Sequence, residues 1–209
     1  SYSSLPLVTR DQPVRLEGAA VTPNFFRTLG VTPVAGRDFA PGDGVPNSAP
    51  VAIISTEVWR SAFEADPAVV GSQVNLGGRP VTIAGVMPPG FNLPFPRARG
   101  IDVWVPLQLD PAKADRQAHY LYVVGRLRDG VSLTSAQEEI AGIGRQLAAE
   151  HTDTNVGRSV RPVSLHEWIV SDVRSPLLLL FAAVGAVLLV ACANVANMLL
   201  ARGTHRRRE

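Results

Sequence analysis

Residues 177–201 read LLLLFAAVGAVLLVACANVANMLLA, and this apolar run decides the class of the protein. No Asp, Glu, Lys, Arg or His occurs from residue 176 to residue 201. The 25 residues of the run would rise by about 37 Å as a helix, and a bilayer core takes about 20 apolar residues. The alternative is a buried helix of a large soluble protein, but a chain of 209 residues could hardly cover such a helix on all sides. The run therefore predicts a transmembrane helix over residues 171–203.

Positive charge is denser after this helix than before it. The twenty residues before the helix hold three arginines and the eight residues after it hold four. The four that follow are Arg202, Arg206, Arg207 and Arg208. Loops rich in Lys and Arg stay on the cytoplasmic side of a membrane. The C-terminal end, residues 204–209, is therefore predicted to be cytoplasmic, and residues 1–175 are predicted to be extracytoplasmic.

Two asparagines interrupt the apolar run. Asn194 and Asn197 are three residues apart, so a helix places them on one face. Interhelical hydrogen bonds are the preferred interpretation of such a pair, and a polar substrate pathway is the alternative. Gly185 and several alanines would let another helix approach closely. This face predicts packing against other transmembrane helices.

Residues 1–175 have a nearly balanced charge, with 16 basic and 17 acidic side chains. This balance provides no basic patch, so nucleic-acid binding is not expected. The single cysteine, Cys192, lies inside the apolar run, which excludes a disulfide or a thiolate metal site in residues 1–175. The domain must be held together by its apolar core.

Strand and helix patterns alternate through the first 165 residues. A Gly77-Gly78 pair between two of the strands indicates a tight hairpin. Ser55 or Thr56 is expected to cap the second helix, and the third helix carries one apolar stripe for a sheet to cover. The predicted strands are 13–21, 51–54, 72–76, 80–86, 101–107, 119–127 and 158–165, and the predicted helices are 24–29, 57–65 and 133–151. This order predicts an α+β fold.

Catalytic and metal-binding patterns are absent from the sequence. The four histidines are widely separated, and no H-E-x-x-H, G-x-S-x-G or G-x-x-x-x-G-K-[ST] motif occurs. Asp102 and Trp104 could form a carboxylate and an aromatic wall in a sugar site, but a core tryptophan on an edge strand is the preferred interpretation. We therefore expect no enzyme, no bound cofactor and no metal site.

Seven structural motifs follow one another in a specific order over nearly the whole length of the chain. They are V-T-P-N-F-F-R-T-L-G-V at 21–31, G-R-D-F at 36–39, V-A-I-I-S at 51–55 followed by Trp59, D-P-A-V-V-G at 66–71, V-M-P-P-G-F at 86–91, D-V-W-V-P-L at 102–107 and A-C-A-N-V-A-N-M-L-L-A-R at 191–202. In these motifs and their order the chain resembles the MacB/FtsX family of ABC-transporter permeases. The most similar type is the duplicated orphan permease of acidobacteria.

The resemblance implies an extracytoplasmic MacB-like core domain over residues 1–170. This domain would combine a porter-like α/β subdomain with a small β-rich subdomain inserted at about residues 67–115. The resemblance also implies further transmembrane helices outside the 209 residues and a location in the bacterial inner membrane.

The function implied by this resemblance is mechanotransmission or export, in which the periplasmic domain couples cytoplasmic ATP hydrolysis to extracytoplasmic work. The implied partners are an ABC-type ATPase subunit in trans, touched by the basic tail, other helices of a permease that forms a dimer, and membrane lipid. One alternative is a single-span sensor with a ligand-binding outer domain. Another is a membrane-anchored periplasmic enzyme, which the lack of catalytic motifs disfavours.

Overall fold

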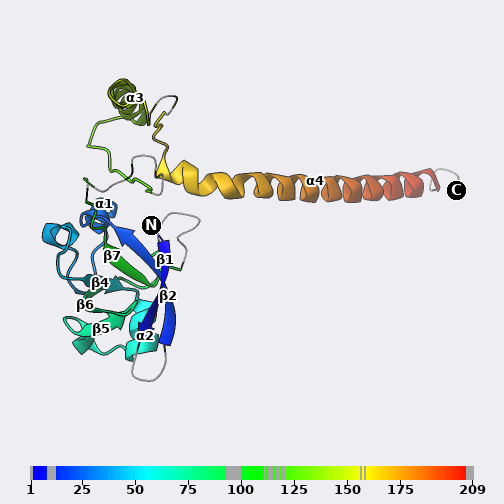
Figure 1. Cartoon of the computed structure of the whole chain (residues 1–209). Coiled ribbons are helices and arrows are strands. Elements are labelled where there is room, and N and C mark those ends of the chain that lie inside the picture. Colours follow the sequence, from blue (N-terminus) through cyan, green and yellow to red (C-terminus); the bar gives the residue numbers. More distant parts are fainter. Residues whose placement is uncertain are drawn as a thin grey trace. The chain divides into compact units, whose positions relative to one another are not determined.

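The computed structural model describes residues 2–8, 13–92, 100–110, 112, 115, 118, 121–155, 157 and 159–205. Within its helices and strands, the side chains of residues 2–4, 13, 171–175 and 194–205 are not described. The chain divides into two compact units, residues Ser1–Pro162 and Val163–Glu209. The first unit contains all the described strands, and the second is mainly one long helix (Figure 1).

The first unit is built on a small β-barrel. Its seven described strands are β1 (Tyr2–Val8), β2 (Pro13–Val21), β3 (Ala35–Gly36), β4 (Val51–Ile54), β5 (Gln73–Leu76), β6 (Arg79–Val86) and β7 (Val103–Pro106). Its helices are α1 (Phe25–Leu29), α2 (Thr56–Phe63) and α3 (Leu133–Glu150), with short 3₁₀ turns at Pro41–Gly44 and Pro67–Val69. Six strands pair in the order β6-β4-β7-β2-β1-β5, and β5 pairs again with β6, which closes the ring. The short β3 adds to the side of β6.

The ring mixes parallel and antiparallel pairs. β2 pairs in parallel with β7, and β4 pairs in parallel with β6, whereas the other pairs are antiparallel. Parallel neighbours need a long crossover between them. The ring therefore joins strands that are far apart in the sequence, such as Gly18 of β2 and Val103 of β7.

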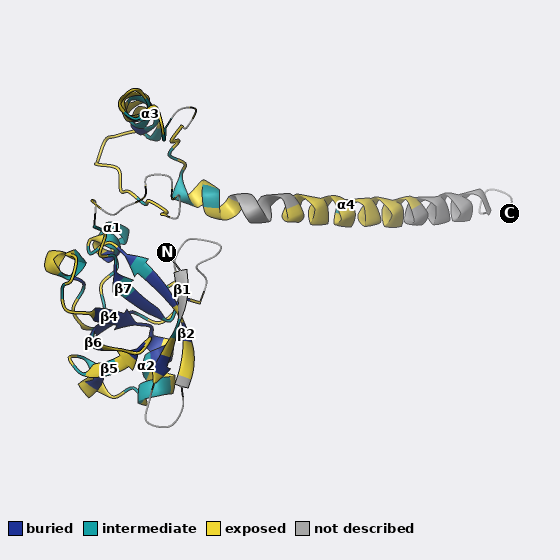
Figure 2. Ribbon diagram, viewed as in Figure 1, coloured by how far each residue is buried: buried dark blue, intermediate teal, exposed yellow. Residues whose placement is uncertain are grey.

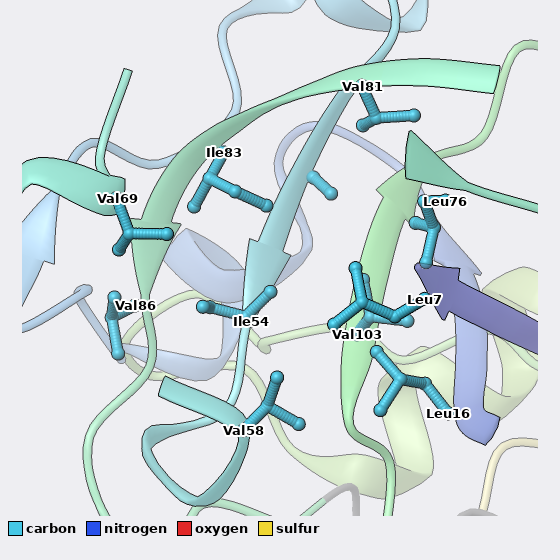
Figure 3. Close-up of a cluster of buried hydrophobic side chains, with 11 residues drawn as sticks. Leu7, Leu16, Ile54, Val58, Val69, Leu76, Val81, Ile83, Val86 and Val103 are labelled. Carbon is cyan, nitrogen blue, oxygen red and sulfur yellow. The ribbon is translucent and has the colours of Figure 1, made fainter. Parts of the chain in front are cut away.

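The core of the first unit lies on the strands of this barrel (Figure 3). Strand β4 lies between β6 and β7, and all four of its residues are buried. Such a continuous apolar run is typical of a strand that is covered on both faces. The sequence predicted a strand at these residues. Eleven buried side chains form one cluster: Leu7, Leu16, Ala52, Ile54, Val58, Val69, Leu76, Val81, Ile83, Val86 and Val103.

Local signals in the sequence set the ends of α2. The hydroxyl oxygen of Ser55 accepts a hydrogen bond from the Val58 N–H at 3.1 Å, so Ser55 is the N-cap. The hydroxyl of Thr56 instead donates to the carbonyl oxygen of the buried Met87. The helix ends at Phe63, two residues before the predicted end, because Glu64 and the residue after it adopt a left-handed backbone.

The predicted hairpin is confirmed. Strands β5 and β6 pair antiparallel from Gln73 and Thr82 to Leu76 and Arg79. Gly77 and Gly78 between them have φ angles of 63° and 80°, the positive values that a tight two-residue turn requires. Strands β5, β6 and β7 all fall within 67–115, the segment expected as an inserted subdomain, and all three are part of the ring.

Two predicted strands are wrong where the structure describes them. Residues 121–127 and 159–164 form no strand, and Leu165 already begins α4 (Leu165–His205). Residues 119, 120 and 158 lie outside the described residues. Aromatic and β-branched residues favour a strand only when they pack on a neighbour, and Val123 is 91% exposed.

The prediction that a sheet covers the apolar stripe of α3 is also not confirmed. Ser132 is the N-cap of this helix, because its hydroxyl oxygen accepts a hydrogen bond from the Ser135 N–H. Ala136 is buried, but Ile143 and Leu147 are exposed. Among the described residues no sheet covers the stripe, so this part of the expectation is wrong.

Gly36 lies where β3 pairs with β6, and substituting it tests this part of the barrel. Its φ angle is +76°, and a Cβ there would lie 2.2 Å from the backbone oxygen of Ala84. Gly71 has a similar φ of +86° with nothing within 4 Å of a Cβ among the described residues, so Gly71→Ala is the matched control. We expect Gly71→Ala to lower the free energy of unfolding by about 1–2 kcal/mol, and Gly36→Ala to lower it by about 3 kcal/mol or more because backbone must also move.

Denaturant unfolding of the full chain in detergent, followed by tryptophan fluorescence, to which the buried Trp104 contributes, measures this difference. Equal losses for the two variants would contradict the described pairing of β3 with β6.

Candidate functional site

The long helix α4 carries the first candidate site, a membrane-spanning segment. α4 has 41 residues, which corresponds to a length of about 60 Å. Within it, the 18 residues Pro176–Ala193 form the one candidate membrane span in the described part of the chain. None of this segment is buried against the rest of the protein, and its large apolar side chains are exposed (Figure 2). The helix predicted over residues 171–203 is therefore present and is long and apolar enough to cross a bilayer.

Only some of the residues predicted to pack or to contact an ATPase lie on this helix as the structure describes it. Gly185 lies inside the candidate span, and no other described group would be within 4 Å of a Cβ placed there. Asn194, Asn197 and Arg202 lie on α4 just beyond the span, and their side chains are outside the described residues. Arg206, Arg207 and Arg208 also lie outside the described residues. The roles of these residues stay predictions.

Asp102 and Trp104 do not form a sugar site. Trp104 is completely buried, which confirms the core tryptophan that the sequence favoured. β7 is not an edge strand, however, because it pairs with β2 on one side and β4 on the other. The carboxylate of Asp102 instead accepts a hydrogen bond from the Glu17 N–H at 2.9 Å. This bond supports the junction of β2 and β7.

An aromatic cluster surrounds Trp104 and holds α1 against the barrel. Phe26 of α1 is fully buried, and its ring lies 5.8 Å from the Trp104 ring and 5.7 Å from the Phe91 ring, both in edge-on contacts. Phe39 also contacts Phe26, with ring centres 6.0 Å apart. The indole N–H of Trp104 has no hydrogen-bond acceptor among the described residues. These rings fix α1 and the segments carrying Phe39 and Phe91 to one another.

A polar cluster lies in the segment after β3. The guanidinium of Arg37 donates to the carboxylate of Asp43 at 2.8 Å, and the Ala40 N–H donates to the same carboxylate oxygen. The Gln108 side chain donates to the backbone oxygen of Asp43 at 3.2 Å. These bonds order a loop that the sequence showed only as rich in Gly, Pro and Asp.

The two carboxylates of this loop are shifted in opposite directions. Partial burial pushes the pKa of Asp43 upward, but the hydrogen bonds from Arg37 and Ala40 and the charge of Arg37 outweigh it, so this pKa is lowered. Burial dominates at Asp38 and raises its pKa, although the Phe39 N–H and the nearby arginines oppose the shift. The hydrogen bond to Asp43 in turn raises the pKa of Arg37.

The arrangement suits a structural clip better than catalysis. Among the described residues, no group of three or more His, Cys, Asp or Glu side chains could hold a metal ion. The sequence missed the pairing of Arg37 with Asp43 because the two residues are six positions apart in an irregular loop. The one signal in the sequence is that Arg37 and Asp43, which lie on either side of Pro41, have opposite charges.

The fold and the helix together define the class of protein: an α+β domain built on a small barrel, followed by one apolar helix that could span a membrane. The family model described as "MacB-like periplasmic core domain" matches residues 2–143. The chain therefore belongs to the MacB-like periplasmic core domain family.

Two curated relatives align with almost the whole chain. It is 26% identical over 208 residues to the Macrolide export ATP-binding/permease protein MacB of Burkholderia thailandensis, covering 99% of this chain and 31% of that protein. It is 25% identical over 199 residues to the Probable export ATP-binding/permease protein MacB of Pseudomonas entomophila, covering 95% of this chain and 29% of that protein. The chain spans less than a third of the length of these relatives.

A solved structure shares the fold. The periplasmic region of MacB from Actinobacillus actinomycetemcomitans matches with a TM-score of 0.51 and 18% sequence identity, over 74% of this chain and 66% of that one. This similarity confirms the predicted α+β fold with a MacB-like periplasmic domain.

The loop after β3 predicts a specific pH dependence of stability. Because the pKa of Asp43 is lowered in the folded state, its charge stabilises the fold above the unfolded pKa, and this contribution disappears as the pH falls through the folded pKa. We expect Asp43→Asn to lower the free energy of unfolding by about 1 kcal/mol at pH 7 and by much less below about pH 3.

Denaturant unfolding at a series of pH values measures this effect. Asp129→Asn, at an exposed aspartate in a turn, is the control and should change stability by less than about 0.5 kcal/mol at either pH. A loss in Asp43→Asn that stays constant from pH 7 to pH 3 would contradict the electrostatic role of Asp43.

Proposed function

We propose that the chain is part of the permease subunit of an ABC transporter and that its barrel domain works outside the membrane. The observation that carries this proposal is the order of parts: a MacB-like periplasmic core domain over residues 2–143 is followed by an exposed apolar helix. Nearly the whole chain, this helix included, aligns with proteins named as export ATP-binding/permease proteins. The likeness therefore covers the domain and its helix in the same order.

Orientation follows from charge. The four arginines between residues 202 and 208 favour a cytoplasmic C-terminus, which places residues 1–175 in the periplasm of a bacterium. The basic tail then lies on the side where an ATPase works, and an acidic surface of that ATPase is a suitable partner for it. We assign the chain to the duplicated orphan permease type, so the ATPase acts in trans.

The work itself is mechanotransmission or export. In this proposal, closure of an ATPase dimer on ATP moves the transmembrane helices, and the movement reaches the barrel domain through α4. The face carrying Gly185, Asn194 and Asn197 packs α4 against other helices of a dimeric permease, where asparagine side chains bond across the helix interface. No bound cofactor in the chain is needed for this role, since ATP binds to the partner.

Co-purification tests this function. The full-length protein that contains the chain, tagged and expressed at its natural level, is expected to bring down an ABC-type ATPase and to raise its rate of ATP hydrolysis. Replacing Arg202, Arg206, Arg207 and Arg208 together by Gln should abolish the association, whereas the matched replacement by Lys should retain it because the charge is kept.

The Lys variant keeps the charge that holds the C-terminus in the cytoplasm, whereas the Gln variant loses it. The topology of the Gln variant is therefore measured as well, so that loss of the contact is distinguished from inversion of the helix. Wild-type protein that brings down no ABC-type ATPase would overturn the proposal. A histidine kinase or a chemoreceptor module found in the same polypeptide would support the single-span sensor instead.

A further inference from the structure

Residues 121–128 connect the barrel part of the first unit to α3, and they do so without forming a strand. Six of these eight residues are apolar or glycine, and most are exposed. An exposed segment of this kind, without regular strand pairing, is expected to have many conformations of similar energy. Any side chain that fixes it to a rigid element therefore has a large effect on its position.

Arg126 makes such a contact with the C-terminal end of α1. Its Nε donates a hydrogen bond to the backbone oxygen of Thr28 at 3.0 Å, across 98 residues of sequence. The last carbonyl groups of a helix have no partner within the helix, and arginine side chains near a helix C-terminus satisfy such groups. The positive charge also lies at the negative end of the short helix.

Two other carbonyl groups of this helix end already accept hydrogen bonds from the backbone. The oxygen of Arg27 accepts from the Gly30 N–H, and the oxygen of Phe26 accepts from the Val31 N–H. The N–H groups of Gly30 and Val31 thus cap two carbonyl oxygens, and Arg126 caps the oxygen of Thr28 as a third.

The helix that Arg126 binds is a rigid point of the domain. Phe26 in α1 is fully buried, and the rings of Phe39, Phe91 and Trp104 surround it. A close-packed aromatic cluster resists displacement. A bond to Thr28 therefore fixes residues 121–128 relative to the barrel core.

Gly30 provides the room for this contact. Its φ angle of +75° ends α1 in the left-handed region, which glycine adopts without strain. A Cβ on Gly30 would lie 3.2 Å from Nη2 of Arg126. Because Gly30 has no side chain, it can adopt the left-handed backbone that ends α1, and it leaves space for the guanidinium of Arg126.

We infer that Arg126 is a clasp that holds the segment leading to α3 on the C-terminal end of α1. One consequence rests on the proposed function: the clasp transmits force between the barrel and the part of the chain that continues toward α4. Arg126 is a positioning residue, because it acts by fixing a segment.

Spin-label distances test the clasp directly. Labels are placed by Val34→Cys and Val123→Cys, at residues that are 56% and 91% exposed, in the full chain carrying Cys192→Ser and held in lipid nanodiscs. We expect one narrow distance distribution with Arg126 present and a broad distribution in Arg126→Gln. Arg126→Lys, which keeps the cation but not the planar guanidinium, should give an intermediate width.

Arg128→Gln is the matched control. Arg128 is exposed, lies two residues further along, and makes no side-chain hydrogen bond to another described residue. It should leave the distribution narrow. The melting temperature should be the same in all variants, because Arg126 is exposed and the aromatic core is unchanged. Equal widths for wild type and Arg126→Gln would overturn the inference.

The clasp and the permease proposal can fail separately. If Arg126→Gln broadens the distribution but no ABC-type ATPase co-purifies with the full-length protein, the clasp stands and the permease function falls. If the ATPase co-purifies and Arg126→Gln leaves the width unchanged, the clasp falls alone.

Discussion

A helix without a single charged side chain over 26 residues is the physical constraint on which the rest depends. Its large apolar side chains are exposed in the isolated chain, and each one gains about 1.5–3 kcal/mol when it leaves water. In hydrocarbon every backbone polar group must also be satisfied internally, which a continuous helix achieves. The helix α4 fulfils both conditions over Pro176–Ala193. This constraint makes α4 a candidate membrane span.

The parts of the barrel that could be predicted are those whose structure is set by a few neighbouring residues. The buried run of β4, the Ser55 cap of α2 and the Gly77-Gly78 turn each depend on a few neighbouring residues, and the structure has all three. Helix α1 likewise ends at Leu29, the predicted last residue. A long apolar helix that could span a membrane was predicted from its length and lack of charge alone. The ordered motifs indicated the MacB-like periplasmic core domain, which the family comparison confirms over residues 2–143.

What the sequence did not predict depends on partners that are distant in the chain. Closure of the ring needs β1 beside β5 and β2 beside β7, and no local pattern contains those pairings. β1 was missed because Pro6 weakens its strand pattern. In the structure Pro6 lies opposite Arg15 of β2, and its carbonyl oxygen accepts a hydrogen bond from the Gly77 N–H. Residues 121–127 show the opposite failure, since they carry strand-forming side chains but form no strand. The candidate contacts of Arg37 and Arg126 were likewise invisible without the fold.

Membrane topology tests the central claim most directly. The full-length protein would carry Cys192→Ser together with either Val123→Cys in the barrel unit or Thr204→Cys after the span. A membrane-impermeant maleimide applied to intact spheroplasts should label the Val123→Cys variant at once. It should label the Thr204→Cys variant only after the membrane is opened. Labelling of position 204 but not of position 123 in intact spheroplasts would contradict an extracytoplasmic barrel, and labelling of both would contradict a helix that spans the membrane.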